Sequence, residues 1–217
     1  MIVIATYNGL DVLKGLILDI KSFNIPNEEV CIVDNKSTDW EFIKYLMDLK
    51  YNGYCLLLNT KPTYQLGAYK LALETLKSDV WFFLQDSIRI KQNIFKEITP
   101  ELTDKNVYTF LTFNDQRILF NPGVSEFLIE HFQMNSYRIG IFGNMFFAKD
   151  SVAQLIKNDW IITKNKLYNN CMEIGLGVIF DRHNIEIIGL DIYDERINVF
   201  DGSTLYPFFD KIAKRRE

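Results

Sequence analysis

The strongest candidate for a chemical role is Asp86, whose carboxylate directly follows a short apolar stretch. Five apolar residues, at positions 80–84, precede the polar cluster of Gln85, Asp86 and Ser87. A short run of β-branched and aromatic residues is typical of a strand buried on both faces, as in the middle of a parallel sheet. Open α/β sheets bind ligands at the carboxyl ends of their strands, so Asp86 would face a binding cleft. The alternative is that residues 85–87 only turn the chain.

Two more polar loops follow apolar runs in the first half of the chain. One comes after the run at positions 2–6 and contains Tyr7 and Asn8, and the other begins with Asp34 and ends at residue 39. The Ser, Thr and Asp residues of the second loop are suited to capping a helix, which is the simpler interpretation of Asp34. If all three loops leave strands of one parallel sheet, their side chains converge on a single edge.

The elements that would position these loops alternate between strand and helix over the first 84 residues. This alternation predicts an α/β fold with a mostly parallel central sheet, right-handed crossovers and flanking helices. It is a Rossmann-like platform, but neither GxGxxG nor a P-loop pattern occurs, which disfavours a dinucleotide oxidoreductase or a P-loop ATPase. The predicted strands are 2–6, 30–33, 54–58 and 80–84, and the predicted helices are 11–23, 40–49 and 66–76.

Composition favours one packed domain. The chain has 217 residues, of which 48% are hydrophobic, and a net charge of -4, which argues against nucleic acid as the main partner. Three distant cysteines without metal-ligand spacing are typical of reduced structural thiols in the cytoplasm. Met1 leads directly into an apolar run, so we expect no signal peptide. No apolar run approaches the roughly 20 residues of a membrane span.

Four stretches together carry a resemblance to a known family. The succession IVIATYNG, CIVDNKSTD, QLGAYKLAL and VWFFLQDS resembles the inverting family 2 glycosyltransferases of GT-A fold, in the same order and with similar spacing over about the first 90 residues. The resemblance implies one GT-A domain over residues 1–217. Residues 1–90 would bind the nucleotide sugar, and residues 91–217 would bind the acceptor.

The resemblance implies a nucleoside site at the first two loops. Thr6, Tyr7 and Asn8 match the loop that lies against the nucleoside, and Asp34 matches the carboxylate that hydrogen-bonds the base edge. Ser37 and its neighbours match the end of that loop. A carboxylate is an acceptor only, so it suits a ring N–H of uracil.

The resemblance also implies a diphosphate site. Gly67 and Lys70 match the region near the phosphates, although a lysine on a helix is more often solvated. Gln85 and Asp86 occupy the position of the family's DxD motif, which holds Mn2+ or Mg2+ through oxygen ligands. Here one carboxylate replaces two, so the element is degenerate, and Asp86 is the one expected metal ligand.

The second half has weaker patterns. We expect a connection with a short helix over 88–97, a strand over 107–113 that pairs with 114–121, and a Pro-Gly turn at 122–123 before a helix over 124–132. A glycine-rich strand would lead into a helix over 152–156, capped by residues 149–151. A helix over 167–182 would end at His183, followed by a strand over 185–190 and a loop over 191–195.

An inverting transferase needs a base that takes the proton from the acceptor hydroxyl. In the family this is an acid at a helix N-terminus after DxD, and Glu173 is the nearest match; Asp159 and Asp181 are rivals. His183 matches the position of a late metal-ligating histidine in some GT-A enzymes, although capping the helix C-terminus is the simpler role.

The predicted activity is transfer of a sugar from a nucleotide sugar to a hydroxyl of a glycan or glycoconjugate. Among nucleotide sugars, a UDP-sugar is the favoured donor. An inactive module that binds sugar nucleotides or glycans stays open, because the QDS element is reduced. A sugar nucleotidyltransferase is less well supported, since the loop after the first strand has one glycine and no basic residue. The basic tail over 211–216 would touch an anionic membrane peripherally or be solvated.

Overall fold

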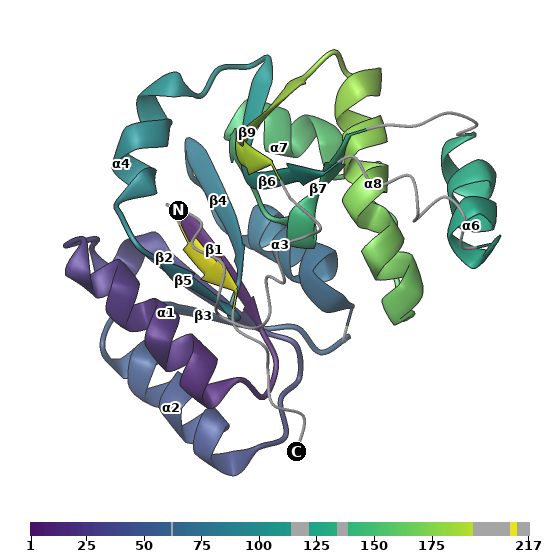
Figure 1. Ribbon diagram of the computed structural model, residues 1–217. Coiled ribbons are helices and arrows are strands. Elements are labelled where there is room, and N and C mark those ends of the chain that lie inside the picture. Colours follow the sequence, from purple (N-terminus) through teal and green to yellow (C-terminus); the bar gives the residue numbers. More distant parts are fainter. Residues whose placement is uncertain (62, 114–121, 134–138, 193–208, 212–217) are drawn as a thin grey trace.

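The computed structural model describes residues 1–61, 63–113, 122–133, 139–192 and 209–211, which are organised around one large sheet (Figure 1). The first half alternates strand and helix, as the sequence predicts. Its elements are β1 (Ile2–Thr6), α1 (Leu10–Ser22), the 3-10 helix η1 (Asn27–Glu29), β2 (Val30–Asp34), α2 (Trp40–Tyr51), β3 (Cys55–Leu58), α3 (Tyr64–Thr75) and β4 (Val80–Gln85). The second half contributes β5 (Ile88–Ile90), α4 (Ile94–Ile98), η2 (Thr99–Glu101), β6 (Asn106–Phe113), α6 (Pro122–Phe132), β7 (Gly140–Ile141), η3 (Phe142–Asn144), β8 (Phe146–Lys149), α7 (Asp150–Ile156), α8 (Lys166–Arg182), β9 (Glu186–Ile192) and β10 (Phe209–Lys211).

The sheet is mostly parallel, and its strand order places β1 between β2 and β4. Four parallel strands run in the order β3-β2-β1-β4. β8 pairs antiparallel with β4 and with β6, so β6 and its parallel neighbour β9 run in the same direction as the first four strands. The short strand β7 pairs antiparallel with the end of β6. The predicted α/β class with a mostly parallel sheet is therefore confirmed.

Helices cover both faces of the sheet because successive strand residues point to opposite sides. Ile2 and Ile4 of β1 belong to the core that packs against α1, α2 and α4, while Val3 and Ala5 belong to the core under α3, α7 and α8. Figure 1 shows α1 and α2 together on one side of β1 and β4, with α3 on the other. The buried residues of α1 recur at helical spacing: Leu13, Leu16, Ile17 and Ile20.

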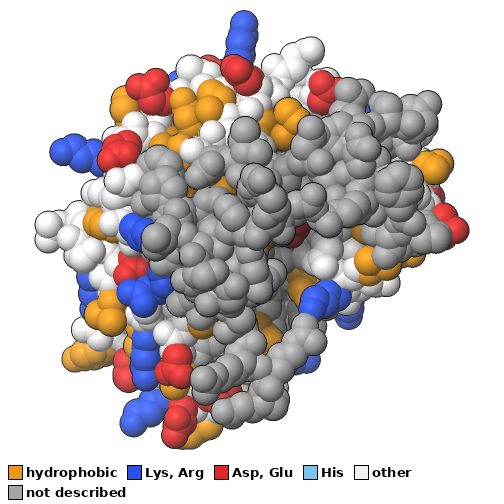
Figure 2. Space-filling view, in the orientation of Figure 1, with side chains coloured by type: hydrophobic (Ala, Val, Ile, Leu, Met, Phe, Trp, Pro, Cys, Tyr) orange, Lys and Arg blue, Asp and Glu red, His pale blue; other side chains and the backbone are white. Residues whose placement is uncertain are grey.

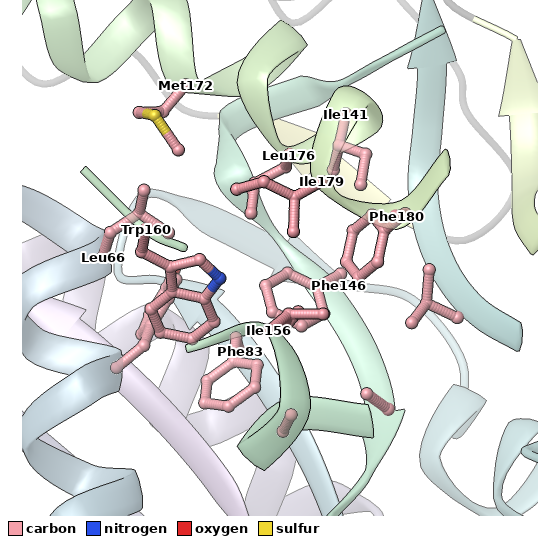
Figure 3. Packing of buried hydrophobic residues seen from close by; sticks show 14 of the residues in the cluster. Leu66, Phe83, Ile141, Phe146, Ile156, Trp160, Met172, Leu176, Ile179 and Phe180 are labelled. Carbon is pink, nitrogen blue, oxygen red and sulfur yellow. The ribbon is translucent and has the colours of Figure 1, made fainter. Parts of the chain in front are cut away.

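Strand β4 is buried on both faces, as its apolar run predicts. Phe83 packs among aromatic rings on the α8 side, with ring centroids 4.9 Å from Tyr69, 4.8 Å from Phe146 and 6.2 Å from Trp160. Figure 3 shows this cluster, in which Leu176, Ile179 and Phe180 of α8 approach Phe146. The C-terminal end of β4 is thus held in a rigid, close-packed core, which makes it a firm support for the residues that follow it.

The short helix predicted within 88–97 is present as α4, but residues 88–90 form the strand β5 and not a connection. β5 pairs antiparallel with β10. The pairing joins segments far apart in the chain, which local patterns cannot reveal. Asp19 of α1 anchors β5, because its carboxylate accepts hydrogen bonds from Arg89 Nε at 2.7 Å and from the Ile90 amide at 2.9 Å.

Four smaller expectations were wrong. Pro122 begins α6, and is not part of a turn before it, since proline is well suited to a first helical position. The predicted cap of α7 does not form, because the Asp150 carboxylate accepts instead from the Trp81 indole at 2.7 Å. The expected continuous glycine-rich strand is interrupted by η3 between β7 and β8. β9 continues to Ile192, into the predicted loop.

The predicted strand over 114–121, the rest of the loop up to residue 195 and the tail from residue 212 lie outside the described residues. No helix in the described part of the chain is both long and apolar enough to cross a membrane. On the face seen in Figure 2, the described Lys, Arg, Asp and Glu side chains are scattered with both signs interspersed.

Candidate functional site

Three of the predicted site residues meet at the carboxyl ends of neighbouring strands. Thr6, the last residue of β1, is the register partner of Asp34, the last residue of β2. Asp86 directly follows β4, and its carboxylate accepts a hydrogen bond from the Thr6 hydroxyl at 2.6 Å. All three side chains are buried, with exposed fractions of 2% for Thr6, 5% for Asp34 and 3% for Asp86. Tyr7, the next residue along β1's loop, is 50% exposed, so it stands at the rim.

The carboxylate of Asp34 is held by the loop that follows it. Ser37 donates to Asp34 from its backbone N–H, at 3.2 Å to each oxygen, and from its hydroxyl. The Ser37 hydroxyl oxygen accepts in turn from the backbone N–H of Asn8 at 2.9 Å. Asp34 is therefore an acceptor with a fixed direction and not a helix cap, since the cap of α2 is Asp39, which accepts from the Phe42 amide at 2.7 Å.

Asn8 connects the first two loops, and its predicted nucleoside contact stays a prediction. Its side-chain oxygen accepts from the backbone amides of Thr38 and Asp39 at 2.9 and 3.1 Å, so it ties the loop after β1 to the loop after β2. Asn8 and Lys36 both have positive φ angles, of 44° and 65°, which an asparagine tolerates better than most residues. These bonds keep the two loops at one spacing around Asp34.

A buried asparagine pair, which the sequence reasoning missed, connects this region to α3. Asn59 donates to the Asn35 side-chain oxygen at 2.8 Å, and Asn35 donates to the Tyr64 carbonyl at 3.2 Å. Asn35 directly follows β2 and Asn59 directly follows β3. An asparagine immediately after each of two adjacent strands was the available signal. The pair places the N-terminus of α3 beside the end of β2.

Gly67 and Lys70 lie on α3, in the part of the helix nearest this edge. A Cβ atom at Gly67 would stand 1.7 Å from the Thr63 hydroxyl oxygen, so glycine is required for Thr63 to fold over the helix. Lys70 is half-buried on the same helix. Tyr69 between them is fully buried, and burial raises the pKa of its hydroxyl well above the usual value, with the nearby Asp86 charge adding to the effect.

Gln85 forms a hydrogen bond with the second half of the molecule. Its side-chain amide donates to the carbonyl of Gly143 in η3. Gly143 has a φ of 68°, and an added Cβ would lie 3.1 Å from the Gln85 nitrogen, so the turn and the amide fit each other. Of the two residues at the DxD position, Asp86 alone supplies a carboxylate.

The donor set fits a divalent ion that takes most of its ligands from a substrate. Within the described ranges, no three His, Cys, Asp or Glu side chains come close enough to form a metal site by themselves. Mg2+ is commonly held through one or two carboxylates together with substrate phosphates, and Asp86 provides one carboxylate.

Glu173 lies in the third turn of α8 and is half-buried. The family pattern implies a base at a helix N-terminus, but α8 begins at Lys166, so Glu173 is further inside the helix than that pattern suggests. The turn before it packs against the donor half: Asn169 donates to the Gln65 side-chain oxygen at 2.9 Å. This bond places the first half of α8 beside the N-terminus of α3.

The rival residues lie at the other end of α8. His183 caps the C-terminus of the helix, and its ring is 2.6 Å from the Asp159 carboxylate. At 1.5 Å per residue, His183 is about 20 Å along the helix from Asn169. Asp181 is exposed at the same end. Asp159, Asp181 and His183 thus lie at the C-terminal end of α8, whereas Glu173 is one turn from the contact between α8 and α3.

The family model for glycosyl transferase family 2 matches residues 1–156. The chain belongs to this family. The match includes the strand ends that carry Thr6, Asp34 and Asp86, but it stops before α8 and therefore does not include Glu173. A search of curated protein sequences finds no match.

Solved structures share the GT-A fold of this family at low sequence identity. GalNAc-T7, solved with UDP, GalNAc and Mn2+, has a TM-score of 0.61 and 10% identity over 88% of this chain and 43% of its own. Glucosyl-3-phosphoglycerate synthase from Mycobacterium tuberculosis, solved with Mn2+, UDP and phosphoglyceric acid, has a TM-score of 0.55 and 13% identity over 91% of this chain and 70% of its own. The mannosyltransferase PcManGT from Pyrobaculum calidifontis, solved with GDP-Man and Mn2+, has a TM-score of 0.54 and 12% identity over 90% of this chain and 57% of its own.

These comparisons confirm the predicted family and fold. The chain spans 43% of the GalNAc-T7 chain and 58% of residues 1–349 of S. aureus TarS, which is less than two thirds of each. At these identities the likeness establishes the fold alone.

Proposed function

We propose that this family 2 protein transfers a sugar from a UDP-sugar to a hydroxyl of a glycan or glycoconjugate, with inversion at the anomeric carbon. The observation that carries the proposal is the meeting of Thr6, Asp34 and Asp86 at adjacent strand ends, with the 2.6 Å bond between Thr6 and Asp86. Family membership supports the same reaction class.

Asp34 selects the nucleobase. Its carboxylate is an acceptor only, and Ser37 holds both of its oxygens, so a base that presents a ring N–H is favoured over one that presents a lone pair. Uracil presents such an N–H. The half-exposed ring of Tyr7 borders the same edge and gives the nucleoside an apolar surface. Asn8 contributes by bracing the loops.

Asp86 would hold a divalent ion, Mn2+ or Mg2+, at the diphosphate end of the donor. When bound, such an ion neutralises the charge that develops on the departing diphosphate. The Thr6 hydroxyl keeps the Asp86 carboxylate in one orientation. Lys70, near the middle of α3, offers a cation to the same phosphates, and Gly67 leaves room for the Thr63 side chain to lie against the helix.

Glu173 serves as the base. Its carboxylate takes the proton from the acceptor hydroxyl while the acceptor oxygen forms a bond to the anomeric carbon. The bond from that carbon to the diphosphate oxygen breaks on the opposite face, and UDP leaves with the electron pair. Attack opposite to the leaving group produces the inversion.

A second function is favoured by one observation. Because Gln85 replaces a carboxylate and donates to Gly143, the molecule also suits a module that binds a sugar nucleotide without turnover. A sugar nucleotidyltransferase is disfavoured by the family match, which covers residues 1–156.

The test combines calorimetry and turnover on the intact chain. UDP is titrated with and without Mn2+, and the hydrolysis of UDP-sugars and their transfer to sugar acceptors are assayed. We expect UDP to bind more tightly with Mn2+, and Asp34→Asn to weaken UDP binding by about 10- to 100-fold, the worth of a hydrogen bond to a charged group. Asp48→Asn, at an exposed position of α2, is the matched control and should bind as the wild type does.

The outcomes separate the candidate functions. Turnover that Glu173→Gln abolishes while UDP binding persists supports the transferase. UDP binding without turnover of any donor supports the binding module. Failure of UDP and other nucleotides to bind would refute both.

A further inference from the structure

A chain of amide groups crosses the molecule between its donor and acceptor halves. Gln85 donates to the carbonyl of Gly143, and the side chain of the next residue, Asn144, donates to the carbonyl of Asn169 at 3.1 Å. The Asn169 side chain donates to the Gln65 side-chain oxygen at 2.9 Å. We call these four side chains, Gln85, Asn144, Asn169 and Gln65, the amide relay.

The relay connects three elements that carry or adjoin proposed functional residues, β4, α3 and α8. Gln85 is adjacent to Asp86 at the end of β4, and Gln65 lies in the first turn of α3, ahead of Gly67. Asn169 is one helical turn before Glu173. In an α-helix the carbonyl of residue 169 accepts from the amide of residue 173, so Asn144 bonds to the same peptide oxygen that anchors Glu173.

Asn144 is an unusual residue for this place if it serves the fold alone. Its side chain is completely buried, and its side-chain oxygen has no hydrogen-bond partner within the part of the chain that the structure describes. A buried acceptor without a partner destabilises a protein, and removing it relieves that penalty. Its φ of 55° is also one that glycine adopts without strain. A glycine at residue 144 would keep this backbone conformation and remove the unpartnered oxygen, at the cost of the bond to the Asn169 carbonyl.

We propose that Asn144 is a positioning residue, which sets the turn of α8 that carries Glu173 at a fixed distance from Asp86. The inference rests on the proposed function. Asn144 itself touches no substrate: it acts through the Asn169 carbonyl, and Gln65 secures the same turn from the side of α3. The relay thereby joins the helical turn that carries the base to the donor site.

The experiment compares Asn144→Gly with Asn184→Gly in the intact chain, using the donor that the wild type turns over. Asn184 also has a positive φ, of 54°, but it is exposed at the far end of α8, so it is a matched control for the backbone effect. For Asn144→Gly we expect kcat to fall by about 10- to 100-fold, as misplaced catalytic groups do, while the donor KM and UDP affinity stay near the wild-type values. Asn184→Gly should match the wild type in all three quantities.

A second variant breaks the relay at its half-buried end. Gln65→Ala keeps a good helix former in α3 and removes the acceptor of the Asn169 side chain, so it should also lower kcat with the KM unchanged. Wild-type kcat in both relay variants would overturn the proposal. A purely structural role would instead lower the melting temperature and raise the KM along with the loss of kcat, and this result would overturn it too.

A wild-type chain without turnover would refute the proposed function, and the inference with it, whereas an active wild type with unaffected variants would refute the relay alone.

Discussion

The bond between Thr6 and Asp86 makes a quantitative prediction for Thr6→Val. Valine has the same shape and the same preference for strands as threonine, so the change removes the hydroxyl and little else. Thr6 and Asp86 are 2% and 3% exposed, and their oxygens are 2.6 Å apart, so water cannot readily replace the lost donor. A hydrogen bond to a charged group in such a place contributes about 1.5–3 kcal/mol, so we expect the free energy of unfolding to fall by about that amount. For a chain of this size the melting temperature should fall by about 3–12 °C.

Thr109→Val is the control for this experiment. Thr109 is also fully buried in the sheet, but its hydroxyl donates to a neutral acceptor, the carbonyl of Met145, at 2.8 Å. Neutral hydrogen bonds contribute about 0.5–1.5 kcal/mol, so this change should cost less. Urea unfolding of the wild type, Thr6→Val, Asp86→Asn and the double variant gives the coupling energy, and Thr109→Val is measured beside them. Equal losses for Thr6→Val and Thr109→Val, or no coupling to Asp86, would refute the view that Thr6 orients a charged carboxylate.

Two further predictions concern α8 and the cysteines. Gly177→Ala would place a Cβ atom 1.8 Å from the Ile139 carbonyl oxygen, so it should lower the free energy of unfolding by about 3 kcal/mol or more, and a wild-type melting curve would contradict the close approach of α8. The pKa of Cys55 is lowered to about 7, chiefly because the Cys31 thiol donates a hydrogen bond to it. Its alkylation by iodoacetamide should therefore be half-maximal near that pH and should move to higher pH in Cys31→Ala, whereas an unchanged profile would contradict the bond.

The first half of the fold and the three strand ends could be predicted because their signals are local. The buried strand that ends before Asp86 shows as an unbroken apolar run, and α1 shows as apolar residues at helical spacing. Parallel strands then bring Thr6, Asp34 and Asp86 to one edge, since their carboxyl ends must meet there. The placement of these side chains follows from strand order alone, although their roles stay predictions.

Contacts between distant segments could not be predicted in the same way. β5 pairs with residues near the C-terminus, and its own sequence of three residues carries no sign of that partner. Asn144 and Asn169 are unremarkable in sequence, and their importance lies in bonds to residues in other elements. In the sequence, Gln85 is visible only as an amide where the family pattern has a carboxylate. Its hydrogen bond to the Gly143 carbonyl could not be predicted, because it joins residues far apart in the chain.

In the proposed site the nucleotide sugar lies along the strand ends, with its nucleobase at Asp34 and its diphosphate at Asp86. A crystal structure of the chain with UDP and Mn2+, with anomalous scattering to locate the metal, tests it most directly. We predict that the uracil ring N–H will donate to the Asp34 carboxylate and that the metal will lie between Asp86 and the diphosphate. A complex in which UDP binds away from both carboxylates would contradict the account.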